Sequence, residues 1–222
     1  MDTGSWSRDR TPRRSTRPGV SFPRTSSCCG RTRGPWPTPT GSPRRSATAS
    51  ARSPPLFLNA GITRPTPLEK ADEETFDEVF EVNAKGQFFT LQKTAPLLAD
   101  GASVVFTVGI GVTSGIPGGS VTAGSRGALL AMVPSLALEL APRRIRVNAV
   151  SPGAVDTPIW TKSGLPAELL AEVKETTATR VPFGRFGTAR EIAETVAFLV
   201  SDGAAYVTGQ NIVVGGGSGL GV

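Results

Sequence analysis

Short apolar runs and longer helical patterns alternate along the last three quarters of the chain. The runs LFLNAG, SVVFTV, IRVNAV and YVTGQNIVVGG are brief and apolar, and turn or glycine residues border them, so each is expected to form a buried strand. Between them lie segments 72–98, 127–141 and 189–199, whose apolar residues recur at helical spacing. This alternation predicts an α/β fold with a parallel sheet and helices on both of its faces.

Two of the predicted helices carry features that call for an explanation. In the first, Phe76, Val79 and Phe80 share a face with Asn83, and an unpaired buried amide costs about 1–3 kcal/mol, so Asn83 needs a partner. The second has a stripe of Leu129, Met132, Leu136 and Leu140. Pro134 interrupts this helix, and a proline inside a helix costs about 3 kcal/mol or forces a kink.

The third helix has a recognisable start. Thr188 and Glu191 have the spacing of a capping box, which predicts a helix running through Leu199.

Residues 1–55 differ from the rest in composition. They hold 11 Arg and 2 Asp, a net charge of +9, and contain no Leu, Ile or Lys, whereas residues 56–222 carry a net charge of −3. Nothing in them repeats at strand or helix spacing, and too little apolar surface is available to offset the entropy of ordering. We therefore expect a disordered segment at 1–55 and a folded domain at 56–222.

Several origins of the basic segment remain open. It is an ordinary disordered tail, an arginine-rich arm for nucleic acid or an acidic surface, an organelle transit peptide, or the product of a reading frame shifted upstream of about residue 55. The abrupt change at Leu56 favours the shifted frame. In that case the coding DNA would decide the question.

Composition excludes several kinds of chemistry. The chain has no histidine, which rules out serine–histidine–aspartate triads and histidine zinc sites. Its two cysteines, Cys28 and Cys29, are adjacent, so we expect no metal site. We see no apolar run long enough for a membrane span and no secretory signal, and we expect a cytoplasmic protein without a membrane or nucleic-acid partner.

Four motifs in the folded half occur in the order found in one family. They are NAG at 59–61, VNAKG at 82–86, RIRVNAVSPGAVDTP at 144–158 and YVTGQNIVVGGG at 206–217. With these motifs, residues from about 56 to 219 resemble the short-chain dehydrogenase/reductase family. The resemblance implies a Rossmann-like, doubly wound parallel sheet, an NAD or NADP cofactor, a small carbonyl or alcohol substrate and a homo-oligomer.

The same resemblance implies roles for individual residues. Asn83 would hold a water in the family's proton relay, and the loop at 163–175 would cover the substrate. The cofactor would lie against seven positions, on its adenosine side and then at its nicotinamide: Asn59, Ala60, Gly61, Pro152, Gly153, Val155 and Thr157. Each also has an ordinary alternative, since a turn, a strand end or a structural amide would use the same residue types.

The sequence departs from the family at its catalytic positions. The tyrosine and lysine that stand four residues apart are Thr122 and Arg126 here, and Gly109 occupies the serine position. Tyr206, the chain's one tyrosine, is expected in the last strand. The glycine-rich phosphate loop and three amino-terminal strands are also missing from residues 1–55.

Three hypotheses about function follow. The chain is a divergent nicotinamide-dependent oxidoreductase, a non-catalytic subunit that keeps the fold, or a frame-damaged product without activity. Cofactor binding separates the oxidoreductase hypothesis from the other two. Even an enzyme that relays protons slowly needs the cofactor to transfer a hydride.

Overall fold

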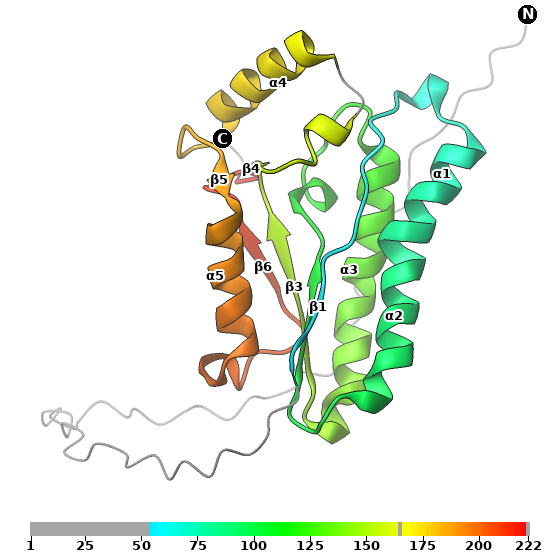
Figure 1. Ribbon diagram of the computed structural model, residues 1–222, viewed down its shortest axis with the longest axis vertical. Coiled ribbons are helices and arrows are strands. Elements are labelled where there is room, and N and C mark those ends of the chain that lie inside the picture. Colours follow the sequence, from blue (N-terminus) through cyan, green and yellow to red (C-terminus); the bar gives the residue numbers. More distant parts are fainter. Residues whose placement is uncertain (1–53, 164–165, 221–222) are drawn as a thin grey trace, which may run out of the picture. The chain divides into compact units, whose positions relative to one another are not determined.

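Four parallel strands form the centre of the computed structural model, which describes residues 54–163 and 166–220 (Figure 1). Their order across the sheet is β1-β2-β3-β6, and a second, two-stranded sheet pairs β4 with β5. The strand bounds are β1 (Leu56–Leu58), β2 (Ser103–Thr107), β3 (Arg146–Pro152), β4 (Val155–Asp156), β5 (Gly187–Thr188) and β6 (Asn211–Val214). The Rossmann-like parallel architecture predicted from the alternating pattern is confirmed. Disorder is predicted for residues 1–55, and residues 1–53 of this segment lie outside the described part.

Helices connect the strands and cover both faces of the sheet (Figure 1). The α-helices are α1 (Glu73–Phe80), α2 (Gln87–Thr94), α3 (Ser120–Leu140), α4 (Ala167–Arg180) and α5 (Ala189–Val200), and a π-helical turn, η2 (Glu81–Gly86), joins α1 to α2. Short 3₁₀ turns complete the chain: η1 (Leu68–Lys70), η3 (Ala95–Leu97), η4 (Ile110–Val112), η5 (Ala141–Arg143), η6 (Thr161–Ser163) and η7 (Asp202–Ala204).

The core is divided between the two faces of the sheet. On β2, Val104 and Phe106 pack with α3 into one apolar cluster, while Val105 between them joins a second cluster with α5. This alternation follows from the two-residue period of a strand. All three side chains are fully buried, as expected for a strand covered on both faces.

The sequence predicts a single helix after β1, but the structure divides this segment. Val79 and Asn83 are fully buried, but Phe76 is 46% exposed and stacks on Phe80 with ring centroids 4.4 Å apart. The π-helical turn η2 divides the predicted helix into α1 and α2.

The helix with the predicted interruption is continuous. α3 begins at Ser120 and runs past Pro134, which lies at an exposed position. Leu129 and Leu136 of the predicted stripe are buried, and Met132 and Leu140 are half-buried. Core packing before and after the proline compensates for the lost backbone hydrogen bond, so the expected interruption does not occur.

The structure also tests the predicted start of the third helix and the predicted last strand. The capping box at Thr188 and Glu191 is present and opens α5. The prediction for Tyr206 was wrong: β6 starts only at Asn211, and Tyr206 lies before it in a fully exposed turn. The turn contains Gly209 at a φ of 71°, a conformation that cannot continue a strand.

One helix in the described part is long and apolar enough to cross a membrane by length and composition. It is the segment Ser120–Arg143, which combines α3 with the turn after it. We expected no apolar run long enough for a membrane span, and this helix meets that test by length and composition. Leu129 and Val133 of this helix are buried against the sheet, and burial of this kind also requires apolar residues.

Replacing Leu129 with Ala tests this packing. Leu129 is fully buried, so L129A is expected to lower the free energy of unfolding by about 2–5 kcal/mol, measured by urea denaturation. The matched control is L138A on the same helix, where the side chain is 76% exposed and the change should stay within about 0.5 kcal/mol. Equal losses for the two variants would contradict the assignment of the inward face.

Candidate functional site

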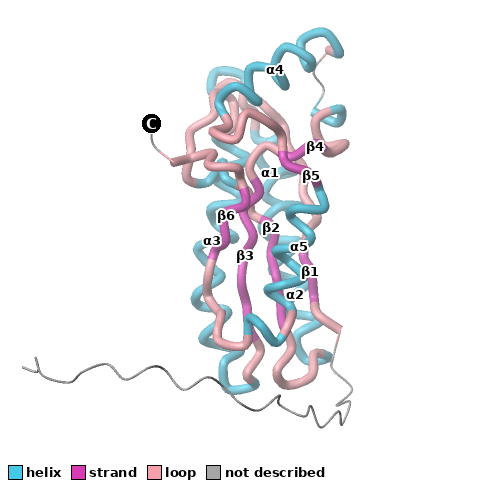
Figure 2. The backbone as a smooth tube through the Cα atoms, turned by 90° about the vertical axis from the view of Figure 1, so that its left-hand side faces the viewer, coloured by secondary structure: helices cyan, strands magenta, loops and turns pink. Residues whose placement is uncertain are grey.

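The carboxyl ends of the parallel strands meet at one end of the sheet. Asn59 follows β1, Gly109 lies two residues after β2, Gly153 follows β3 and Gly215 follows β6. In Figure 1 the arrowhead of β3 points towards the end where α4 lies, and Figure 2 shows the strands running alongside one another towards it. Ligands of open α/β sheets bind at this end, and most of the predicted site residues lie there.

Asn83 is the centre of a buried hydrogen-bond network. Its Oδ1 accepts from the Ile62 amide at 2.9 Å, and its Nδ2 donates to the Ile62 carbonyl at 3.0 Å. The same Nδ2 lies 3.1 Å from the Ser125 hydroxyl, which donates to the Thr122 carbonyl at 2.8 Å. The amide is fully buried and satisfied, so the side chain fastens the segment after β1 to α3.

A second amide supports the same segment, and the sequence reasoning missed it. Gln87 is 2% exposed and its Nε2 donates to the Ala60 carbonyl at 2.6 Å. Its position four residues after Asn83 was the available signal, because residues at that spacing share a helix face. Ala60 and Ile62 are therefore each held by one buried amide from the helical segment 73–94.

Thr122, the predicted counterpart of the family's tyrosine, lies on the first turn of α3. Its hydroxyl lies 3.5 Å from the hydroxyl of Thr63, and either oxygen can donate. Thr63 belongs to the segment that Asn83 fastens, which explains how the two threonines meet. The contact is between two weakly acidic aliphatic hydroxyls.

The guanidinium of Arg126 contacts the end of the sheet. The residue is 9% exposed, and Nη1 donates to the Thr107 carbonyl at the end of β2 over 2.7 Å. A Cβ placed on Gly61 would lie 1.5 Å from Nη2, so the guanidinium fills the space that the missing side chain leaves. Burial lowers the pKa of Arg126 to about 10, and the group remains protonated at neutral pH.

Gly109 and Gly153 shape the backbone next to this network. Gly109 has a φ of 104°, which L-residues rarely adopt, so a side chain at this position would be strained. A Cβ on Gly153 would lie 2.7 Å from Cα of Gly215. The ends of β3 and β6 therefore approach closely, as Pro152 and Gly153 leave the sheet.

The predicted nicotinamide positions continue into β4. Val155 is buried, and its carbonyl accepts from Nε1 of Trp160 at 2.8 Å. Thr157 is half-buried, and its hydroxyl has no hydrogen-bond partner among the described residues. The structure gives no direct contact that joins Val155 or Thr157 to Asn83 or Arg126.

The predicted substrate cover, residues 163–175, overlaps the first part of α4. Lys174 of this helix forms an ion pair with Asp156 at 2.7 Å, and its ammonium lies 5.7 Å from the ring centre of Phe186. Phe186 also meets Trp160 edge to face, with centroids 5.3 Å apart. The helix has no buried residue of its own, so these side-chain contacts hold it near the end of β4.

Chemically, these residues offer hydroxyls, amides and one buried cation. Among residues 54–163 and 166–220, no group of three side chains is arranged to hold a metal ion. Side-chain amides and hydroxyls position polar ligands, but at neutral pH they are poor proton donors.

Comparison with known proteins identifies the family. A family model described as enoyl-(acyl carrier protein) reductase matches residues 55–219. The 3-oxoacyl-[acyl-carrier-protein] reductase FabG of Thermotoga maritima is 41% identical over 165 residues, which cover 73% of this chain and 64% of that protein. The chain thus spans less than two thirds of the length of such relatives.

Solved structures agree with the sequence match. A short-chain dehydrogenase family protein from Francisella tularensis aligns with a TM-score of 0.67 and 32% identity, covering 74% of this chain and 70% of the other. The angucycline C-6 ketoreductase LanV, solved with bound NADP, aligns with a TM-score of 0.68 and 32% identity, covering 74% and 63%. Because the family model matches residues 55–219, about three quarters of its length, this chain belongs to the short-chain dehydrogenase/reductase family of oxidoreductases.

Proposed function

We propose that this chain is a short-chain dehydrogenase/reductase, an NAD(P)-dependent oxidoreductase by descent, whose degenerate catalytic tetrad no longer supports efficient carbonyl reduction. The observation that carries the proposal is the pair Thr122 and Arg126 at the positions of the family's tyrosine and lysine. The proposed substrate class is a small carbonyl compound or the corresponding alcohol.

The proton donor is the first requirement that the chain fails. Reduction of a carbonyl needs a proton for the oxygen, and the hydroxyl of Thr122 is a far weaker acid than a phenol. Tyr206 cannot substitute, because it precedes β6 and so lies at the opposite end of the sheet from Gly153. Asn83 keeps its family position, but its side chain is already committed to Ile62 and Ser125.

The cation is the second departure. A lysine ammonium near a phenol lowers the phenol pKa, whereas Arg126 has no phenol to act on and donates to the Thr107 carbonyl. Its planar guanidinium also differs from an ammonium in geometry and hydration. The guanidinium therefore links α3 to the end of β2, and its catalytic use is lost.

The residues at the end of β3 fit the nicotinamide end of a cofactor better than the rest of the site fits the adenosine side. Pro152, Gly153 and Val155 leave the sheet at its ligand-binding end, and the Thr157 hydroxyl is uncommitted for a carboxamide. A bound nicotinamide would supply or accept the hydride. Asn59, Ala60 and Gly61 would lie towards the adenosine, but the space beside Gly61 is filled by Arg126.

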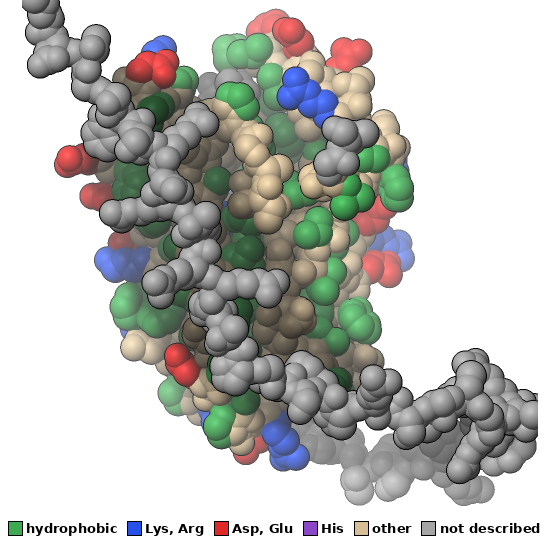
Figure 3. Space-filling model, turned by 180° about the vertical axis from the view of Figure 1, so that it is seen from behind, with side chains coloured by type: hydrophobic (Ala, Val, Ile, Leu, Met, Phe, Trp, Pro, Cys, Tyr) green, Lys and Arg blue, Asp and Glu red, His purple; other side chains and the backbone are tan. Residues whose placement is uncertain are grey.

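A non-catalytic subunit is the second candidate, favoured by one surface feature. A groove between α1, α2 and α3 has an apolar floor and an acidic rim, and it is lined by Glu74, Asp77, Glu78, Phe80, Glu81, Ala84, Lys85, Phe88, Phe89, Ala128 and Met132. Figure 3 shows hydrophobic side chains spread over the face seen from behind, with charged groups mainly towards its edges. Such surfaces favour association, in this case with another copy or with an intact paralogue.

Restoring the tyrosine and lysine tests the proposal. The T122Y/R126K double variant is expected to reduce a 3-oxoacyl thioester with NADPH about 10²–10⁴-fold faster than the parent chain, because it regains the acid. Cofactor fluorescence and protein melting at millimolar NADPH are measured first, and absorbance then follows turnover. The control T122F/R126K lacks only the phenol oxygen and should stay at the parent rate.

Two results would decide against the proposal. Turnover by the parent chain that T122A abolishes would make Thr122 a working catalytic group. Cofactor binding undetectable in the parent and in the double variant would favour the non-catalytic subunit instead.

The contact between Gly61 and Arg126 gives a separate test. G61A places a methyl group where Nη2 lies, so the guanidinium must leave Thr107, and the free energy of unfolding should fall by about 1–2 kcal/mol. In an R126A background the loss should be smaller by about 0.5 kcal/mol or more, as a double-mutant cycle in urea would show.

Gly124 supplies the matched control on α3. It is exposed, and a Cβ there would meet Phe80 at an ordinary 3.6 Å, so G124A should stabilise the helix by about 0.5–1 kcal/mol. Strict additivity of G61A and R126A would contradict the contact.

A further inference from the structure

Arg126 is a buried cation with a single hydrogen bond among the described residues. The residue is 9% exposed, and Nη1 donates to the Thr107 carbonyl at 2.7 Å. A guanidinium has five N–H donors, and a carbonyl carries no net charge, so this bond satisfies one donor and leaves the charge without an opposite. Burial of an ionised group is unfavourable unless an opposite charge compensates for it.

A second arginine of the same fold has the compensation that Arg126 lacks. Arg146 is half-buried and donates to two carbonyls, those of Leu199 and Ser201. Burial lowers the pKa of Arg146, and the charge of Asp202 acts in the opposite direction. For Arg126, burial alone lowers the pKa, to about 10, and no acidic side chain of the described part opposes it.

The acidic residues of the chain do not supply the missing charge. All ion pairs between described residues involve other cations. Residues 1–53, 164–165 and 221–222, which the structure does not describe, contain only two acidic side chains, Asp2 and Asp9, beside eleven arginines. A bound anion is therefore the most direct source of an opposite charge for Arg126.

Two hydroxyls lie close to the guanidinium. Thr122 precedes Arg126 by four residues, so both side chains share a face of α3. Thr63 Oγ1 is 3.5 Å from Thr122 Oγ1, and Thr63 follows Gly61 by two residues, which span at most about 7 Å. Because Nη2 of Arg126 fills the space beside Gly61, the segment 61–63 follows α3 from the guanidinium to the hydroxyl pair. Both threonines are half-buried, and each hydroxyl can donate.

The amino terminus of α3 favours negative charge at the same place. α3 starts at Ser120 without a side-chain cap and without an acidic residue in its first turn. Its first backbone amides and its dipole therefore attract an anion. This terminus follows the carboxyl end of β2, where Thr107 binds Arg126 and where ligands of open α/β sheets bind.

We propose that Arg126, Thr63 and Thr122 together bind the carboxylate of a small oxo acid. Nε and Nη2 of Arg126 donate to no atom of the described residues, and a planar guanidinium matches the two oxygens of a carboxylate. The threonine hydroxyls donate to the remaining lone pairs. The oxo group rests on the proposed function, which requires a carbonyl, whereas the carboxylate rests on Arg126 and its neighbours.

Acetoacetate and methyl acetoacetate test the proposal with the full chain. They share the 3-oxobutanoyl group, but only acetoacetate carries a carboxylate. Isothermal titration calorimetry at constant ionic strength measures both affinities. We expect acetoacetate to bind about tenfold more tightly than the ester, because only the carboxylate makes charge-assisted hydrogen bonds. Butyrate, which has a carboxylate and no oxo group, should also bind more tightly than the ester, whether or not the chain reduces carbonyl compounds.

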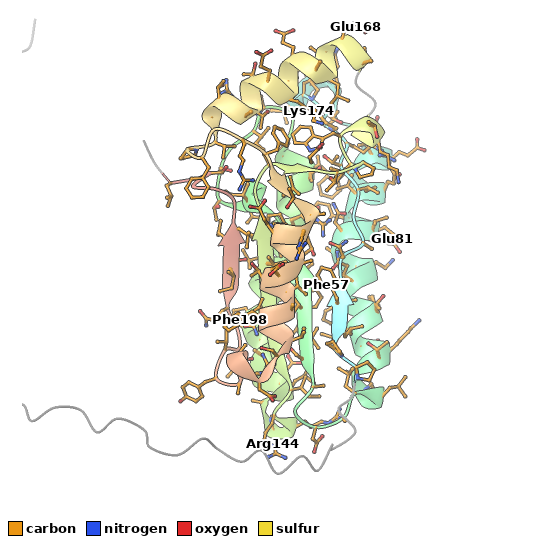
Figure 4. All side chains as sticks on the ribbon, turned by 60° about the vertical axis from the view of Figure 1, so that its left-hand side comes forward. Phe57, Glu81, Arg144, Glu168, Lys174 and Phe198 are labelled. Atoms are coloured by element: carbon orange, nitrogen blue, oxygen red, sulfur yellow. The ribbon has the colours of Figure 1, made fainter. Side chains whose placement is uncertain are left out.

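Matched variants make the preference for the carboxylate specific to one arginine. R126Q should reduce the preference to about twofold or less, whereas R146Q should leave it unchanged, because Arg146 starts β3 at the opposite end of the sheet. In Figure 4, Arg144, two residues before Arg146, lies at the end of the fold opposite Lys174 of α4. A general loss of stability weakens both ligands alike and does not change their ratio.

Two further variants guard against misfolding of R126Q. R126K keeps the charge and should keep part of the preference, although an ammonium lacks the planar fork. T122V keeps nearly the shape of threonine and should reduce the preference about threefold, because one donor is lost. Melting temperatures of all variants establish that they remain folded.

Three outcomes would overturn the proposal. The first is undetectable binding of acetoacetate at millimolar concentration, or affinity equal to that of the ester. The second is a preference that R126Q leaves unchanged, or that R146Q removes to the same extent. The third is tighter binding of inorganic phosphate than of acetoacetate, which would assign the site to a phosphate group.

Discussion

A parallel sheet needs apolar cover on both faces, and the architecture of this chain follows from that constraint. Val104 and Phe106 of β2 face one helix layer and Val105 faces the other, so one strand is buried on both sides by alternate residues. Where cover is present, the strand is fully buried. At β1 the helix cover is present on one face only, and Phe57 on the other face is 42% exposed.

At the ligand-binding end of the sheet, buried polar side chains join the strand ends to the helices. Asn83 and Gln87 fix the backbone after β1, and Arg126 closes the gap between Gly61 and the end of β2. Each group satisfies backbone polar atoms that would otherwise be unpaired near the core. Buried polar side chains can thus contribute to stability by pairing backbone groups, which makes residue identity alone a poor guide to activity.

Much of the fold was predictable from the sequence, because strand and helix periods are local properties. The four apolar runs became strands and the Thr188 capping box opened α5. Pro134 and Tyr206 were misjudged, since tertiary packing keeps α3 continuous and a glycine turn delays β6. In the site, the sequence predicted that Asn83 needs a partner. It did not predict the pairing of Asn83 with Ile62, the role of Gln87, or the contact of Arg126 with Thr107, because these contacts join distant segments and no local pattern encodes them.

The π-helical turn between α1 and α2 also sets how the chain can change by insertion or deletion. A π-turn holds one residue more than an α-turn, so removing a residue from Glu81–Gly86 would convert it to regular helix and leave the residues after it on the same face. Leu91 would then stay in the core. A deletion inside α1 or α2 would instead rotate the rest of the helix by about 100°, so a change of one residue in length is more tolerable at this turn than in the helices on either side of it.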